Sequence, residues 1–269
     1  MTIMQTSLRS TGVLGAICIL AACGGGGTAI IEDVPFNDPS SQETAALAGA
    51  SLDSLARSSS VETGTLNRAA DTASLGDLSG TINADRSLIT LDGGGTVTLD
   101  PSDQTYSALF DASPLNGDRT IGVIGAVTDL EGLPTGLATY TGTTQLTIQD
   151  GVTVYDLTGD AAITANFATG SVRTTLDGLS GTQSNGITAT TQATDVATIT
   201  IDGSDITDAT FSDGDVTVSS TTLSALSTSA ATSVSGAFFG SGADEVGGVL
   251  AVDDTASGTV SILGDFIAK

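Results

Sequence analysis

The chain has 269 residues, and its 31 acidic residues against 7 basic ones give a formal charge of −24 at pH 7. This charge repels nucleic acid and anionic lipid headgroups, so we exclude both as partners. The sequence has no histidine or tryptophan and only two methionines and two cysteines. Histidine, cysteine and methionine are the residues that most catalytic triads and most zinc, copper or haem sites require, so the composition speaks against such sites.

The first residues have the layout of a secretory signal peptide, in which a basic residue, Arg9, precedes a short apolar run. The run is shorter than the roughly 20 residues that a membrane span needs. It ends in a pattern that resembles the lipobox, where bacterial lipoproteins are acylated on cysteine and then cleaved. The residues of that pattern are Leu20, Ala21, Ala22 and Cys23. We therefore expect residues 1–22 to be removed as a lipoprotein signal peptide, and Cys23 to carry a covalent lipid with no other cofactor.

Removal of the signal peptide would leave Cys23 as the one cysteine of the mature chain, because Cys18 lies in the segment that is lost. No disulfide could then form. In bacterial lipoproteins, aspartate after the lipidated cysteine favours retention in the inner membrane, whereas this chain has Gly24. The resemblance implies a lipid-anchored protein of the outer membrane, with its body facing either the cell exterior or the periplasm.

Residues 23–60 are predicted to be a lipidated flexible tether that is mostly irregular. Glycines directly follow Cys23 and favour a flexible chain. The rest of the segment lacks the sustained period of a helix or a strand. A weak helix is expected between Glu43 and Arg57, where leucines lie loosely on one side.

From about Leu75 onward the sequence has the residue pattern of a β protein. Thr, Val, Ile and Leu alternate with polar residues, and Gly, Asn and Asp interrupt them at the spacing typical of an antiparallel sandwich or barrel. Residues 61–133 are predicted to be a small β region, and residues 134–269 an antiparallel barrel of about eight strands, since closure removes exposed edges. The expected strands of the first region are 79–83, 88–92, 96–99 and 104–110.

Turn signals and alternation organise the second region. Asp150-Gly151 is the strongest kind of short hairpin signal, and Thr169-Gly170 separates two further apolar segments. Alternation is strict from Ala197 to Ile201 and again from Val260 to Phe266, which predicts that each strand has one buried face and one face in water. The expected strands are 139–149, 152–157, 161–167, 171–176, 186–192, 196–201, 205–211, 216–222, 233–239, 246–252 and 258–266.

A pattern near the C-terminus consists of Gly236, Phe238, Phe239, Gly240, Ala243, Glu245, Gly247 and Gly248. It resembles the hallmark near the end of the barrel domain of transferrin-binding protein B, a barrel also found in factor H binding protein and related surface lipoproteins. Two weaker echoes precede it, Tyr140-Thr141-Gly142 and Ala165-Asn166-Phe167. The resemblance implies a barrel in residues 134–269, preceded by a small handle-like β-sheet in residues 61–133.

The residues of this pattern predict a structural role. Phe238 and Phe239 are neighbours on a strand, so one should enter the barrel and the other should pack against a neighbouring element. Gly247 and Gly248 would let the next strand bend or let an aromatic ring lie across it. Glu245 would hydrogen-bond the loop backbone. We interpret the pattern as maintaining the fold, with a ligand contact as the alternative.

Catalysis and metal binding have little support, and we predict that the protein is not an enzyme. A Ser–Lys pair could use only Lys269, at the end of the chain. Hydrolysis by two carboxylates is allowed by the composition, but the aromatic platforms on which sugars stack are nearly absent. Calcium is the metal that the composition permits; because acidic β-turns are usually plain turns, we assign no metal site. The candidate carboxylates are Asp202, Asp205, Asp208, Asp213 and Asp215.

Three functions stay open on this basis. The first is a monomeric, lipid-anchored binding module of the outer membrane that contacts a protein or a solute. The second is a structural surface-coat lipoprotein without a dedicated ligand, and the third is a carboxylate-dependent hydrolase. Binding hot spots favour Trp, Tyr and Arg, and this chain has no Trp and three Tyr. The resemblance therefore supports the barrel more than it supports transferrin as the ligand.

Overall fold

The computed structural model describes residues 36, 44–53, 58–100, 103–115, 119–185, 190–254, 256 and 258–269. The predicted signal peptide, its lipobox and Cys23 lie outside the described residues. The chain divides into two units, Met1–Ile31 and Glu32–Lys269, and everything below concerns the second. Among the described residues, no helix has the length and apolar character needed to cross a membrane.

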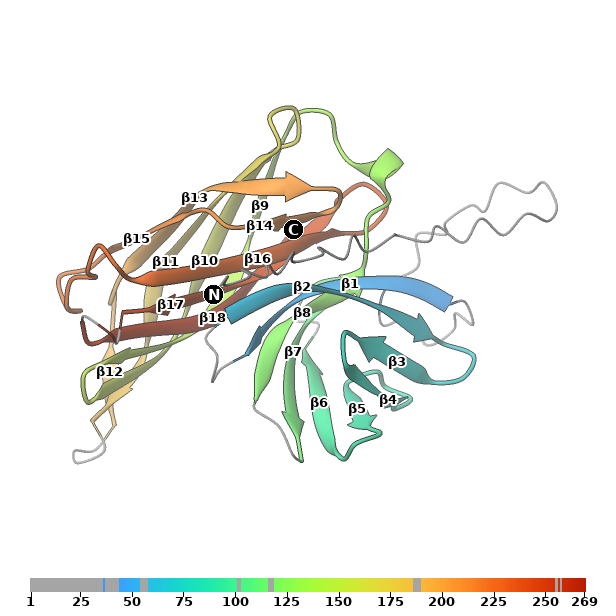
Figure 1. The fold of residues 1–269 in the computed structure, drawn as a ribbon, viewed down its shortest axis with the longest axis horizontal. Helices are drawn as coiled ribbons and strands as arrows, with labels where there is room; N and C mark the ends of the chain where they lie inside the picture. The colour runs from blue at the N-terminus through green and yellow to red at the C-terminus, as the bar shows by residue number, and fades with distance from the viewer. Residues whose placement is uncertain are drawn as a thin grey trace, which may run out of the picture. The chain divides into compact units, whose positions relative to one another are not determined.

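The prediction of an all-β fold is confirmed. The described part of the chain contains eighteen strands and one short 3-10 helix, η1, at Leu130–Gly132. Antiparallel pairing divides the strands into two closed barrels, β1 to β8 and β9 to β18 (Figure 1).

The first barrel is an eight-stranded meander in which each strand pairs with the next and β1 pairs with β8. Alternate residues point inward, and buried leucine, isoleucine, valine and phenylalanine side chains fill the interior. Its strands are β1 (Thr44–Asp53), β2 (Ser58–Asn67), β3 (Thr72–Leu75), β4 (Leu78–Ile82), β5 (Leu88–Leu91), β6 (Gly95–Asp100), β7 (Ser107–Pro114) and β8 (Thr120–Ala126).

The predictions for residues before 61 are wrong where the structure describes them. Thr44–Asp53, placed in an irregular tether with a weak helix, is strand β1, and the expected boundary at residue 60 falls inside β2. The β region is also larger than a handle-like sheet, because it closes into a barrel. The reason is that both faces of β1 carry buried apolar side chains. Leu47 enters the barrel interior and Leu52 packs outside it, so no period of two is visible in the sequence.

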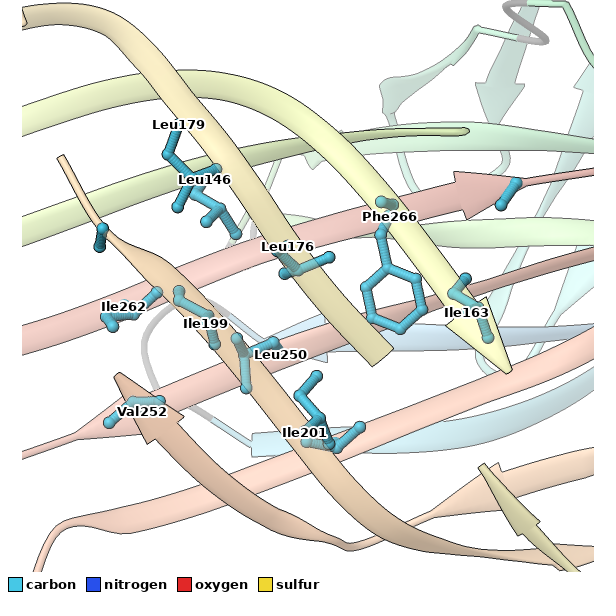
Figure 2. Close-up of a cluster of buried hydrophobic side chains, with 14 of the residues drawn as sticks. Leu146, Ile163, Leu176, Leu179, Ile199, Ile201, Leu250, Val252, Ile262 and Phe266 are labelled. Atoms are coloured by element: carbon cyan, nitrogen blue, oxygen red, sulfur yellow. The ribbon is translucent and has the colours of Figure 1, made fainter. Parts of the chain in front are cut away.

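The second barrel confirms the predicted antiparallel barrel of about eight strands. Its wall closes through a pairing between β11 and β13, and two short strands, β12 (Thr191–Ala193) and β15 (Asp215–Ser219), lie beside it. Figure 2 shows the leucine, isoleucine and valine side chains that fill its interior around Phe266. The strands of the wall are β9 (Leu137–Asp150), β10 (Thr153–Asn166), β11 (Ser171–Ser184), β13 (Thr198–Thr207), β14 (Thr210–Ser212), β16 (Ala231–Phe239), β17 (Glu245–Asp253) and β18 (Val260–Ala268).

Both predicted hairpins are present, but two predicted breaks are not, because residues 202–204 lie inside β13 and residues 158–160 lie inside β10. Asp150 pairs with Thr153 across the first turn, and Asn166 pairs with Ser171 across the second. The segments expected at 152–157 and 161–167 form the single strand β10, because Gly159 occupies a register shift between Thr158 and Asp160. A glycine in a strand often marks such a bulge and not the end of the strand.

Alternation predicted burial correctly in one strand and incorrectly in another. In β13, Ile199 and Ile201 are buried and Thr198 is exposed. In β18, the face expected to lie in water is also buried, including Asp265 and Ile267. This outer face of β18 packs against the first barrel. The buried apolar cluster that joins the barrels consists of Ala50, Leu52, Leu109, Val123, Ala237, Phe239, Val249, Ala251 and Ile267.

Candidate functional site

The aromatic pair of the C-terminal pattern lies on opposite faces of β16. Phe238 enters the core of the second barrel, where its ring centroid is 4.9 Å from that of Phe167 and 5.6 Å from that of Phe211. Phe239 points the other way, into the cluster between the barrels. Both rings are fully buried. One residue pair therefore contributes to the interior of a barrel and to its contact with the neighbouring barrel.

Two glycines of the pattern make room for aromatic rings. A Cβ atom on Gly236 would lie 2.0 Å from Cζ of Phe211, and one on Gly248 would lie 2.7 Å from Cζ of Phe266. Neither distance is compatible with a side chain. The rings thus lie across the strands at positions that only glycine permits.

The turn that follows β16 is held by Tyr140, a residue of the weaker echo. The Tyr140 hydroxyl donates a hydrogen bond of 2.8 Å to the carbonyl of Ala243, which has a φ of +55°. Burial, with a smaller effect from the charge of Asp244, raises the pKa of Tyr140 to about 12. Tyr140 therefore stays a hydrogen-bond donor at neutral pH. The echo and the pattern, far apart in sequence, meet at this bond.

Glu245 is the polar residue of the pattern, and it is only 2% exposed. Its Oε1 accepts a hydrogen bond of 2.5 Å from the backbone N–H of Thr105, and its Oε2 accepts one of 3.0 Å from that of Tyr106. The Ser107 hydroxyl donates a third, of 2.7 Å, to Oε2. All three donors belong to the first barrel and the segment that enters its strand β7. Glu245 accepts hydrogen bonds from loop backbone, but the loop belongs to the first barrel. Nothing in the sequence near Glu245 indicates this contact.

Further polar contacts join the barrels near these residues. The backbone N–H of Gly240 donates to the carbonyl of Ala126, and that of Thr128 donates to the carbonyl of Phe238. On another side, the Ser59 hydroxyl lies 2.8 Å from that of Ser233. Because charge-assisted, neutral and apolar contacts all cross the boundary, the two barrels form one packed body.

A cleft of about 400 Å³ opens beside this contact, between the first barrel and the outer wall of the second. On the first-barrel side, Arg119 binds Asp111 through three hydrogen bonds of 2.7 to 3.1 Å. This bonding raises the pKa of Arg119 against the opposing effect of its burial. The cleft is lined by Arg119, Ile121, Gln145, Leu146, Thr147, Asp156, Leu157, Thr158, Leu263 and Asp265.

Asp265 is the unusual group in this cleft. It is 7% exposed, and its Oδ1 atom is buried without a hydrogen-bond partner among the described residues. Burial raises the pKa of Asp265 to about 7; the charge of Arg119 lowers it, and those of Asp111 and Asp100 add to the rise. Nothing in the sequence singles out Asp265, because an aspartate is what the predicted wet face of β18 would carry.

The acidic residues considered for calcium do not gather into a metal site. Asp202 lies 3.5 Å from Arg173 in an exposed ion pair. Asp208 and Asp213 have φ values of +57° and +66°, so they occupy tight turns, as acidic turn residues commonly do. No group of three or more His, Cys, Asp or Glu side chains placed to hold a metal occurs in the described ranges.

A family model for the C-lobe and N-lobe β-barrels of Tf-binding protein B matches residues 133–269, just over half of the chain. The chain belongs to this family. All residues of the C-terminal pattern lie within the matched segment. In this chain, the pattern includes Phe239 and Glu245, through which the matched barrel contacts the barrel that precedes it.

Solved structures of Tf-binding protein B resemble most of this family member in fold. A double mutant from Haemophilus parasuis Hp5 matches with a TM-score of 0.57 and 16% identity, over 83% of this chain and 44% of that one. Intact Ap-TbpB, with N and C lobes, matches with a TM-score of 0.51 and 18% identity, over 83% and 45%. This chain thus spans less than half the length of these relatives. No curated protein matches it.

Proposed function

We propose that the protein is a lipid-anchored, non-catalytic binding module of the outer membrane whose ligand is a protein. Membership of the Tf-binding protein B barrel family is the observation that carries this proposal. The solved relatives are named for binding transferrin, which is a protein. For this chain we propose a protein as the class of ligand, and we do not propose transferrin itself.

Filled barrel interiors favour a protein ligand over an enclosed solute. Closely packed apolar side chains occupy both interiors. The cavity within the first barrel, near Leu75 and Phe110, has a volume of about 20 Å³, which is close to that of one water molecule. Small-molecule sites usually measure about 300–1,000 Å³. A ligand therefore has to meet the outer surface or the clefts between the elements.

The anchor in this proposal is the lipid on Cys23, within the lipobox Leu20–Cys23. A bacterial lipoprotein carries more than one acyl chain, and two or more chains anchor a protein stably where a single chain binds reversibly. Glycines after Cys23 would separate the acidic body from the bilayer, and the net charge of the chain favours that separation.

Two experiments test the proposal. Wild type and Cys23→Ser are produced in a Gram-negative host and separated into membrane and soluble fractions; the variant should be released, and its retention in the membrane would contradict the anchor. Protease treatment of intact cells then reports which side the body faces.

The full Cys23→Ser chain is next immobilised and tested against transferrin and against native growth medium. Saturable binding of one protein supports the module, and failure to bind any would contradict it.

One observation favours the second candidate, a surface-coat lipoprotein without a dedicated ligand. Binding surfaces usually show a contiguous apolar patch or exposed aromatic anchors. The large apolar side chains that are exposed in the described part are aliphatic: Val61, Leu115, Leu130, Leu137 and Val152. The same binding experiment distinguishes this candidate, because it predicts no saturable partner.

A further inference from the structure

The outer wall of the second barrel presents an ordered array of polar side chains beside the cleft. Strand register places Asp265 opposite Gln145, Gln145 opposite Thr158, and Thr158 opposite Ser180, so that one row crosses β18, β9, β10 and β11. Parallel rows lie on either side of it. They are Leu263, Thr147, Asp156 and Thr182, and Ile267, Thr143, Asp160 and Asp177.

The cleft continues along these rows as a second hollow. That hollow has a volume of about 460 Å³ and shares Gln145 and Thr158 with the cleft. Gly159, at the register shift in β10, and Gly178 have no side chains to fill it. Neighbouring strands are about 4.8 Å apart, so a row across four strands spans about 14 Å, the reach of about four extended residues. We call the cleft and the hollow together the acidic groove.

The groove has an unbalanced negative charge. Asp156, Asp160 and Asp265 line it. Arg119 is the one basic residue among its lining residues in the described part, and its Nε and Nη2 atoms donate three hydrogen bonds to Asp111. The remaining lining is mostly threonine, serine, glutamine and glycine. A ligand that complements this surface carries positive charge and hydrogen-bonding backbone.

Asp265 adds an observation that the acidic residues alone do not supply. Its side chain is more than nine-tenths buried, it lines the cleft, and its Oδ1 lacks a partner in the described ranges. A buried polar atom without a partner is uncommon and costly. Because Asp265 lines the cleft, a cation placed there would lie beside this poorly solvated carboxylate.

We propose that the acidic groove binds a basic, extended segment of a partner protein, with one lysine or arginine side chain of that segment held by Asp265. This proposal rests on the proposed function, since it names the chemistry of the protein ligand. An anionic ligand does not fit, because it would face three carboxylates and a guanidinium that is already bound. A metal ion does not fit either, because no three ligating side chains converge among the described residues.

The state of Asp265 provides a readout specific to this site. Its pKa near 7 means that a cation binds best after the carboxyl loses its proton, so affinity should rise between pH 6 and pH 8. The charged groups that face Asp265 are Arg119, Asp111 and Asp100, and Asp156 lines the same cleft. The variant Asp265→Asn tests whether this pH dependence belongs to Asp265.

The test uses the full chain with Cys23→Ser and a fluorescein-labelled hexa-arginine peptide, followed by fluorescence anisotropy at about 0.15 M ionic strength, where long-range attraction is screened. We expect Asp156→Asn with Asp265→Asn to weaken binding at least about tenfold at pH 8. The matched control, Asp208→Asn with Asp215→Asn, removes the same charge from outside the groove and should weaken binding by less than about twofold. Asp265→Asn alone should abolish the rise in affinity between pH 6 and pH 8.

Equal losses in the two double variants would overturn the groove, because the peptide would then respond to total charge. Equal affinity for spermidine and for hexa-arginine would also overturn it, since the site would then hold a small polycation. A native protein partner whose binding is unchanged by Asp156→Asn with Asp265→Asn would overturn the groove and leave the binding module intact. Hexa-arginine binding that depends on Asp265, without any native protein partner, supports the groove and contradicts only the proposed function.

Discussion

Strands β9 to β11 and strands β16 to β18 belong to the same barrel, but they differ in what their outer faces meet. Along β9, buried and exposed residues alternate, and the exposed ones are mostly threonine and glutamine. Along β17, every residue from Glu245 to Val252 is buried. The inner faces of both groups fill one core, so the difference comes from the first barrel, which covers β16 to β18.

This difference separates two tasks within one sheet. The covered strands join the barrels through Phe239, Ile267 and the carboxylate of Glu245. The uncovered strands β9 to β11 present polar side chains, and together with Leu263 and Asp265 of β18 they line the acidic groove. Substitutions on the two outer faces should therefore have very different effects on stability.

The largest expected effect comes from Phe239→Ala. The ring is fully buried between the barrels, and removal of such a ring typically costs about 3–5 kcal/mol. Urea unfolding of the variant and wild type measures the loss. A loss below about 1 kcal/mol, the size of an average substitution, would show that the contact between the barrels contributes little to stability.

A matched pair on neighbouring strands sharpens the comparison. Ile267 of β18 and Thr143 of β9 are opposite each other on the outer face, but Ile267 is buried and Thr143 is exposed. Ile267→Ala should lower the free energy of unfolding by about 2–5 kcal/mol, whereas Thr143→Ala should stay within about 0.5 kcal/mol of wild type. Similar changes in the melting temperatures of the two variants would contradict the distinction.

Glu245→Gln tests the polar part of the contact. Glutamine keeps the size and one acceptor oxygen, but it places an amide NH₂ against donors of the segment Thr105–Ser107. One buried donor left without an acceptor costs about 1–3 kcal/mol. Glu131→Gln, at an exposed position of η1, is the control and should change stability by less than about 0.5 kcal/mol.

The effect of Asp265→Asn on stability should depend on pH. The folded state raises the pKa of Asp265 from 3.8 to about 7, so the folded state holds the proton more tightly than the unfolded state. Stability of the wild type should therefore fall as pH rises from about 4 to about 7 and then level off. The variant should lack this part of the fall and be more stable than wild type at pH 8. Parallel stability curves from pH 4 to pH 8 would contradict this.

The second barrel was largely predictable from sequence, because its strands follow local rules. Asp150-Gly151 sets a hairpin, and alternation from Ala197 to Ile201 sets the buried face of β13. The pattern around Phe238 and Phe239 located the segment that matters for the fold. These signals depend only on residues close together in the sequence, and the turns and buried faces of the folded barrel match them.

The remaining features depend on contacts between residues far apart in the chain. β1 was missed because its two faces are both buried, which hides the strand period. Thr105, which donates a hydrogen bond to Glu245, lies 140 residues earlier in the chain. No local sequence pattern indicates this contact. Asp265 was expected on a wet face, and it is buried only because the first barrel covers β18.

Hydrogen exchange followed by mass spectrometry tests most directly the claim that the two barrels form one body held by Glu245. It reports the opening free energy of each barrel separately. In the wild type, core amides of β1 to β8 and of β9 to β18 should open with the same free energy, and Glu245→Ala should lower that value in both barrels. If Glu245→Ala changed exchange only at Thr105–Ser107, the barrels would be stable independently and would not form one body held by Glu245.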